Sequence, residues 1–186
     1  MKIRFTFALM LTLCIWMFPA CDSSNSSEEN KDKTTENTPP PDPNTLFENF
    51  ETMFFQETLP FNLAYNYPPS GNSIAEEQMA NFLGRKGEVY PAARFPLGAD
   101  YQALVTTEAS GDNFIFILNV FSKQGELTDH KQVAGPSGNE VMDAIFTDDA
   151  SWAVTTRPRA EDTGEPIGEG SVTNYTVNSD GKITEK

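Results

Sequence analysis

Apolar residues fall in two separate parts of this chain. The first is an uncharged, mostly apolar run over 5–18, and the polar tract behind it continues to Asn44 with proline as its only apolar residue after position 21. Apolar density returns from Thr45 onward. A tract this polar buries too little surface to offset the cost of ordering its backbone. The pattern therefore predicts a leader over 1–20, a disordered Ser/Asp/Glu/Pro tether over 21–44 and a single globular domain over 45–186.

Two short helices are predicted at the start of the folded part. Apolar residues recur there at helical spacing over 46–57 and again over 74–83, where Gly84 marks the end. Each segment opens on a capping box, Thr45 with Glu48 and Ser73 with Glu76. Between the helices, alternating residues from Phe61 to Tyr67 predict a short strand.

The remainder of the chain has the pattern of antiparallel strands. Segments rich in β-branched and aromatic residues alternate with Gly, Asn, Asp and Ser. The six predicted strands are 101–107, 114–121, 127–133, 141–146, 152–156 and 172–177. The segment 114–120 is apolar except for Asn119, which predicts the central strand. The expected fold class is α+β, a twisted antiparallel β-sheet meander with two short N-terminal helices.

Two of the predicted turns resemble each other. The residues around Gly125 and around Gly181 share one order of apolar, turn, glycine, charged and apolar residues. Two copies are too few to indicate a repeat architecture. They predict two similar hairpins in which glycine supplies a positive φ.

Charge and cysteine content limit the classes of function. The 186 residues carry 27 acidic and 13 basic side chains, a net charge of −14. Such an excess repels nucleic acid and anionic lipid headgroups, so neither is an expected partner. Both cysteines, Cys14 and Cys21, precede the folded part, so the domain has no disulfide and no thiolate metal site.

The first residues are typical of a secretory signal peptide, with Lys2 and Arg4 ahead of the apolar run. Because Cys21 directly follows the small Ala20, the stretch resembles the lipobox of bacterial lipoproteins. The resemblance implies cleavage before Cys21 and attachment of lipid to its sulfur. Phe18 departs from the leucine usual at that position. An uncleaved membrane anchor and ordinary secretion without lipid are the alternatives.

Other features resemble lipoproteins of Bacteroidota. Acidic residues at Asp22, Glu28 and Glu29 are similar to the export signal of their surface lipoproteins, whereas Asp22 also resembles the inner-membrane retention signal of enteric bacteria. The order of helix, Leu-Pro-Phe, helix and strand meander resembles a class of uncharacterised lipoproteins from Bacteroidota. These resemblances imply the bacterial cell envelope, lipid-anchored at the outer membrane, and assign no functional residue inside the domain.

No catalytic constellation is evident. His130 is the only histidine and lies between Asp129 and Lys131, so a solvated surface position is expected. Ser137 lies outside a Gly-x-Ser-x-Gly elbow. We therefore expect no catalytic residue, no cofactor and no metal. The turn acids Asp143, Asp148 and Asp149 leave a calcium site as the weaker alternative. Their spacing is not that of a regular calcium loop.

Two further features each have a structural and a functional interpretation. The first is a set of aromatic residues that suits core packing better than a sugar-stacking surface: Tyr65, Tyr67, Tyr90, Trp152 and Tyr175. The second is the segment 157–170, which has no secondary-structure pattern and is expected to be a mobile linker or a partner-binding loop.

These observations predict a lipid-anchored envelope protein whose domain binds or assembles without catalysis. Its expected partners are the membrane, through lipid on Cys21, and an envelope protein or a glycan. An envelope hydrolase that uses carboxylates and a carbohydrate-binding module are the alternative functions.

Overall fold

Strands dominate the computed structural model, which describes residues 42–186 except 70, 112, 148 and 149. Of these residues 51% lie in strands and 12% in helices, and they belong to one compact unit. The elements are α1 (Pro43–Glu51), β1 (Phe55–Gln56), β2 (Phe61–Leu63), α2 (Glu76–Gln78), the π-helix η1 (Met79–Leu83), β3 (Val89–Leu97), β4 (Tyr101–Ser110), β5 (Asn113–Ser122), β6 (Leu127–Ser137), β7 (Glu140–Phe146), β8 (Ser151–Pro158), β9 (Ser171–Val177) and β10 (Ile183–Glu185).

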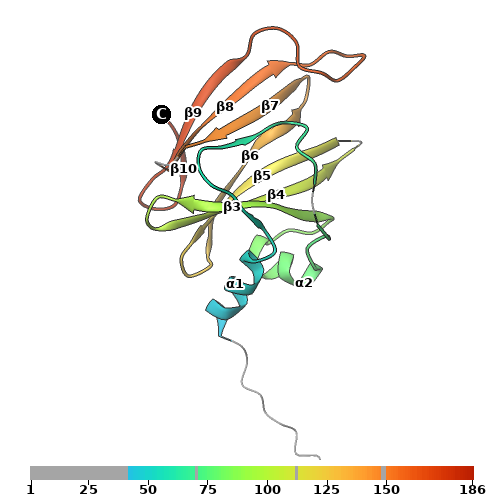
Figure 1. Cartoon of the computed structure of the whole chain (residues 1–186). Helices are drawn as coiled ribbons and strands as arrows, with labels where there is room; N and C mark the ends of the chain where they lie inside the picture. Colours follow the sequence, from blue (N-terminus) through green and yellow to red (C-terminus); the bar gives the residue numbers. More distant parts are fainter. Residues whose placement is uncertain (1–41, 70, 112, 148–149) are drawn as a thin grey trace, which may run out of the picture. The chain divides into compact units, whose positions relative to one another are not determined.

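The antiparallel meander is confirmed, but the class α+β is not. From β3 to β10 each strand pairs antiparallel with the next one along the chain. At one edge β1 pairs parallel with β3, and β2 leaves this order to pair with β7. The described part is therefore a mostly β protein with one open mixed sheet of ten strands (Figure 1).

The strand β3 has no counterpart among the predicted strands because it contains Pro91 and Pro96. Proline lacks the N–H that a strand donates, so two prolines argue against a central strand. The edge of a sheet tolerates them. Here only Phe55 and Gln56 pair with the outer edge of β3, opposite Ala93 and Arg94.

The sheet folds back on itself at β6, which changes its partner at Gly135. Residues before Gly135 pair with β5, whereas Gly135 to Ser137 pair with β7. Gly135 has φ of 92°, and a Cβ there would lie 2.5 Å from the carbonyl oxygen of Phe114. The result is a layer of β3 to β5 facing a layer of β7 to β10 (Figure 1). β2 pairs with the part of β7 that β6 leaves unpaired.

A large apolar core fills the space between the two layers. Its aromatic members pack ring against ring, as in the 4.7 Å contact between the centroids of Phe95 and Phe146. The main contributors are Phe61, Leu63, Phe95, Val105, Phe116, Leu118, Val120, Val133, Phe146, Trp152 and Val154. Burial of this much apolar surface is the main favourable term in folding.

A second core lies between the helices and the other face of the β3 to β5 layer (Figure 1). Phe50 of α1 is fully buried and stacks on Phe82, with ring centroids 4.6 Å apart. The sheet contributes Leu104 and Phe121 to this cluster. Within the residues that the structure describes, no helix combines the length and apolar character needed to cross a membrane.

Both predicted capping boxes are wrong. Helix α1 begins at Pro43, and the side chain of Asp42 caps it by accepting a hydrogen bond from the N–H of Asn44 at 3.1 Å. A proline in the first turn, preceded by aspartate, is a stronger start signal than the box two residues later. Pro43 and Asn44 thus lie in the helix and not in a tether. Helix α2 begins at Glu76 without a side-chain cap, and Gly84 ends η1 with φ of 62°.

The two similar hairpins are confirmed in detail. In each turn the first residue, Ser122 or Asn178, donates its N–H to the carbonyl four residues later and accepts the N–H of Gly125 or Gly181. Both glycines have positive φ, 81° and 73°. The shared sequence pattern therefore corresponds to a shared turn geometry.

Candidate functional site: a cleft at the loop end of the sheet

Four connections meet at one end of the described domain. Because neighbouring strands run in opposite directions, every second connection lies at the same end of a meander. The β4–β5, β6–β7 and β8–β9 connections lie together there, beside the connection from β2 to α2, on the right of Figure 1. Loops carried on a rigid sheet are common sites of binding.

The β8–β9 connection, over 159–170, is folded back on itself by backbone hydrogen bonds. Arg159 and Pro166 form an isolated antiparallel bridge. The N–H of Ala160 donates to the carbonyl of Glu165, the N–H of Gly164 to that of Ala160, and the N–H of Ile167 to that of Pro158, each at 2.8 to 2.9 Å. The N–H of Arg159 donates to the carbonyl of Asn139 in the β6–β7 turn at 2.9 Å. This segment therefore has a defined conformation and a defined neighbour, which the sequence pattern did not predict.

Tyr65, in the connection after β2, is held at both ends. Its N–H donates to Oδ1 of Asp143 at 2.6 Å, and its hydroxyl donates to Oε2 of Glu165. Arg157 donates to the other oxygen of Asp143. Asp143, predicted to be a turn acid, thus lies in β7 and fixes the backbone of Tyr65. The hydrogen bond to Glu165 raises the pKa of Tyr65, and desolvation adds to the effect.

Three adjoining hollows surround Tyr65 and Arg159. The middle one, of about 220 Å³, has both residues in its wall. Tyr65 also lines a neighbour of about 350 Å³, and Arg159 lines another of about 590 Å³. We call these three hollows together the Tyr65–Arg159 cleft. The two outer hollows lie within the range of roughly 300–1,000 Å³ that is typical of ligand sites, and the middle one is smaller.

Arg159 differs from the other arginines of the described part. Arg85, Arg94 and Arg157 each pair with a carboxylate, whereas the side chain of Arg159 makes no ion pair or hydrogen bond with any described residue. A Cβ on Gly164 would lie 2.7 Å from Nη2 of Arg159, so this glycine leaves room for the guanidinium. The cleft therefore contains a charged donor that has no partner in the described part of the chain.

The lining of the middle hollow also includes apolar side chains. The ring of Tyr67 makes edge contacts with Phe61 and Phe116 of the core, and burial raises its pKa. Beside it are three residues that lie far apart in the sequence, namely Pro69, Phe114 and Pro136. Phe114 is 38% exposed, which is unusual for so large an apolar side chain.

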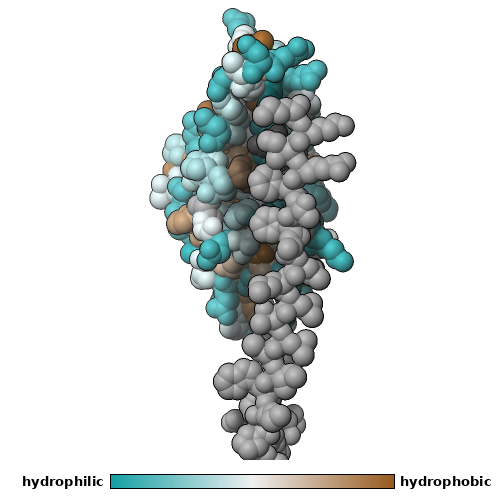
Figure 2. Space-filling model, turned by 90° about the vertical axis from the view of Figure 1, so that its right-hand side faces the viewer, coloured by the Kyte–Doolittle hydropathy of each residue, from teal (hydrophilic) through white to brown (hydrophobic). Residues whose placement is uncertain are grey.

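The face drawn in Figure 2 is viewed from this side of the molecule. Hydrophilic residues predominate on it, and outside the grey atoms the hydrophobic positions lie in small separate groups.

The predicted aromatic set does not form one surface. Trp152 is only 2% exposed and stacks on Tyr175 within the core, with ring centroids 5.8 Å apart. Tyr90 lies on β3, where its hydroxyl donates to Glu88. Core packing is thus the role of Trp152 and Tyr175, and only Tyr65 and Tyr67 reach the cleft.

The remaining predicted residues lie elsewhere. His130 is exposed on β6, where its N–H donates to Oδ1 of Asp129, and Ser137 lies at the end of the same strand. Among the described residues no group of three His, Cys, Asp or Glu is placed to hold a metal ion. Cys21, Asp148 and Asp149 lie outside the described residues.

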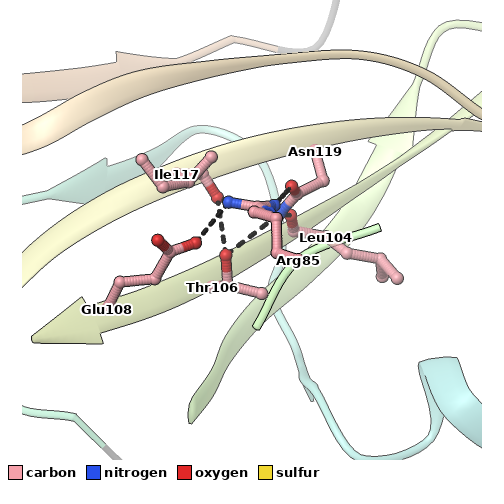
Figure 3. Close-up of polar contacts among 6 residues, drawn as sticks. All are labelled: Arg85, Leu104, Thr106, Glu108, Ile117 and Asn119. Carbon is pink, nitrogen blue, oxygen red and sulfur yellow. Dashed lines mark hydrogen bonds and ion pairs between the residues drawn. The ribbon is translucent and has the colours of Figure 1, made fainter. Parts of the chain in front are cut away.

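A buried polar network was not predicted (Figure 3). Arg85 donates to Glu108 and to the side-chain oxygen of Asn119, and burial lowers the pKa of Arg85. The amide nitrogen of Asn119 donates to Thr106 Oγ1 at 3.1 Å and to Leu104 O at 2.9 Å. The one available signal was Asn119, the single polar residue in the apolar run of β5. The side-chain carbonyl and the NH₂ group of Asn119 both form hydrogen bonds within the fold, so we assign this network a role in stabilising the domain.

Comparison with known proteins gives no identity for this chain, since no family model, no curated protein and no solved structure matches it.

Proposed function

We propose that this protein is a lipid-anchored, non-catalytic binding protein of the bacterial cell envelope, and that its ligand occupies the Tyr65–Arg159 cleft. The observation that carries the proposal is the guanidinium of Arg159. It lines two adjoining hollows and has no protein partner among the described residues. Desolvating a charged group is costly unless it is paired, so a partly enclosed arginine without a carboxylate is typical of a ligand site.

The anchor part of the proposal rests on the N-terminal sequence. Lys2, Arg4, the apolar run and Ala20-Cys21 together resemble a lipoprotein signal. We propose that lipid on Cys21 holds the mature protein at the outer membrane, with the polar tract as a spacer. A spacer of about 20 residues has a root-mean-square length on the order of 25 Å, enough to leave the loop end accessible.

An envelope hydrolase has weaker support. Its mechanism would need a carboxylate near the cleft that is free to exchange a proton. Both oxygens of Asp143 already accept hydrogen bonds, from Tyr65 and Arg157, and Glu165 accepts one from the Tyr65 hydroxyl. Asp143 and Glu165 therefore position protein groups, and Glu161, which also lines the cleft, is exposed to solvent. This arrangement suits a binding site better than a pair of reactive carboxylates.

Site-specific photo-crosslinking in intact cells tests the proposal. A photoreactive amino acid replaces the exposed Asn66 at the cleft or, as a matched control, the exposed Gln124 in the turn at the other end of the sheet. We expect adducts from position 66 and none from position 124, in a protein that fractionates with the envelope. Cys21→Ala should release the protein from that fraction. Equal adducts from both positions, or a Cys21→Ala protein that stays in the envelope, would contradict the proposal.

A further inference from the structure

We infer that the ligand of the Tyr65–Arg159 cleft is an uncharged glycan chain, whose sugar rings lie against the aromatic and proline wall while Arg159 donates to their hydroxyls. The inference rests on the proposed binding function and names the chemical class of the ligand. Four properties of the cleft carry it, namely its aromatic and proline lining, its planar polar side chains, its three prolines without an N–H, and its charge.

The apolar wall suits the face of a sugar ring. A pyranose presents C–H groups on its faces and hydroxyls around its rim, so it needs a flat apolar surface with polar groups beside it. Tyr65, Tyr67 and Pro69 contribute rings to the lining of the middle hollow. Aromatic side chains of this kind supply large contact area at little cost in conformational entropy.

The polar groups around that wall are planar and uncommitted. The guanidinium of Arg159 and the amides of Asn66 and Asn113 all line the middle hollow, and none of these side chains has a hydrogen bond to another described residue. Guanidinium and amide groups present two hydrogen-bonding atoms side by side. Neighbouring hydroxyls of a sugar have a matching spacing, so each group can bind a pair of them.

The cleft is poorly equipped to bind a peptide backbone. Peptide recognition by strand addition depends on main-chain N–H and C=O groups of the protein. Pro68, Pro69 and Pro136, which line the middle hollow, have no N–H to donate. These three lining residues therefore offer no main-chain donor, which disfavours recognition of a peptide by strand addition.

The charge around the cleft favours an uncharged ligand. Glu161 lines the same hollow as Arg159, Glu165 lies at Tyr65, and the whole chain carries a net charge of −14. A polyanion would be repelled by this field. A neutral chain encounters no such repulsion and uses the carboxylates as hydrogen-bond acceptors.

The three hollows indicate more than one sugar unit. They adjoin at Tyr65 and at Arg159, so a chain that lies across both residues contacts all three. We therefore expect affinity to rise from monosaccharides to longer oligosaccharides.

The test is calorimetric titration of the whole mature protein with a panel of neutral oligosaccharides, from single hexoses and N-acetylhexosamines to linear hexamers. We expect binding that strengthens with length and that changes less than about twofold with ionic strength, because no ion pair is screened. Arg159→Gln should weaken binding about tenfold, the effect of losing a hydrogen bond from a charged donor. Lys123→Gln, which removes the same charge in a turn at the opposite end, should leave binding unchanged.

Several outcomes would overturn the inference. Binding that Arg159→Gln and Lys123→Gln weaken equally would place the glycan elsewhere. If no member of the panel binds while position 66 still forms adducts in cells, the ligand class is wrong and the binding function stands. If a proline-rich or other peptide competes at the cleft in an Arg159-dependent way, the ligand is a peptide. The absence of both glycan binding and adducts would remove the inference together with the proposed function.

Discussion

Tyr65 shows how one side chain can join parts of the chain that are far apart. Its backbone is held by Asp143 of β7, and its hydroxyl is held by Glu165 of the β8–β9 connection. Nothing in the sequence around Tyr65 points to either partner, because both lie more than 70 residues away. The aromatic residue itself was a candidate for ligand contact from the sequence, whereas its anchoring could not be predicted.

The Tyr65–Glu165 hydrogen bond predicts a pH dependence. It stabilises the protonated phenol and raises its pKa above the ordinary value of about 10. Its contribution to stability is therefore complete below the unfolded pKa and disappears as pH rises through the folded pKa. The difference in phenolate absorbance between the wild type and Tyr65→Phe, followed during an alkaline titration, isolates this group.

Glu165→Gln is the control for that titration. It keeps a hydrogen-bond acceptor but removes the negative charge, so the pKa of Tyr65 should fall towards its ordinary value. A Tyr65 that titrates at the same pH with and without the Glu165 carboxylate would show that the contact does not form in solution.

Asn119 illustrates a residue whose position was predicted but whose role was not. The apolar run identified β5 as a buried strand, and β5 is indeed fully buried over 116–121. The amide of Asn119 lies on the face of β5 away from the main core. Arg85, in the segment after η1, donates a hydrogen bond to its side-chain oxygen. Burying a polar group without a hydrogen-bond partner is costly, so a buried Asn119 needs partners. The sequence does not show which residues these are, because the fold brings them together from distant positions.

Among the elements, strands with a regular pattern were predicted well and irregular ones were not. The segments 114–121 and 141–146 lie within β5 and β7, where runs rich in apolar, β-branched and aromatic residues lie between turn residues. β3 was missed because of its prolines, and β1 because two residues carry no pattern. The predicted end of the first helix, at 57, was too late, since Phe55 and Gln56 pair with β3.

Strand β6 depends on one glycine for its change of partner. Gly135 combines a positive φ with a close approach to the backbone of Phe114 and Ile115. A side chain at this position would have to displace main-chain atoms of β5, which a packed sheet resists. The bend, and with it the second layer, therefore requires glycine at this position.

Gly135→Ala should be strongly destabilising. We expect a loss of about 3 kcal/mol in the free energy of unfolding, from left-handed backbone strain together with the steric clash. Gly138→Ala is the matched control, because Gly138 has φ of 60° and no atom within 4 Å of an added Cβ. That variant should lose only about 1 kcal/mol. Chemical denaturation measures both, and equal losses would show that the close approach at Gly135 carries no cost.

At the scale of the whole molecule, the meander brings the binding groups together. The cleft combines residues of the β2–α2 connection, the start of β5 and the β8–β9 connection, which are separated by tens of residues in the sequence. The sequence predicted turns between antiparallel strands, but not which connections would line a cleft. The fold-back of the sheet at Gly135 and the bridge between Arg159 and Pro166 decide that, and neither has a sequence pattern of its own.

The two ends of the sheet also differ in construction. At the end opposite the cleft, tight turns with Gly125 and Gly181 close the β5–β6 and β9–β10 hairpins. Ile183 of β10 also donates its N–H to Asp129 of β6 at 2.8 Å. Lys131 of β6 lies 4.6 Å above the ring of Tyr175 on β9. These cross-layer contacts stabilise that end, whereas the cleft end contains Arg159, whose side chain has no partner among the described residues.

The most direct test of the account is hydrogen exchange of the whole mature protein, measured by mass spectrometry alone and with cell envelopes from a strain that lacks it. The account predicts slower exchange in 64–69 and 158–167 on addition of envelopes, with no change in the hairpin turns around Gly125 and Gly181. Protection of those turns, protection of the helices, or no protection in either loop would contradict the assignment of the Tyr65–Arg159 cleft as the ligand site.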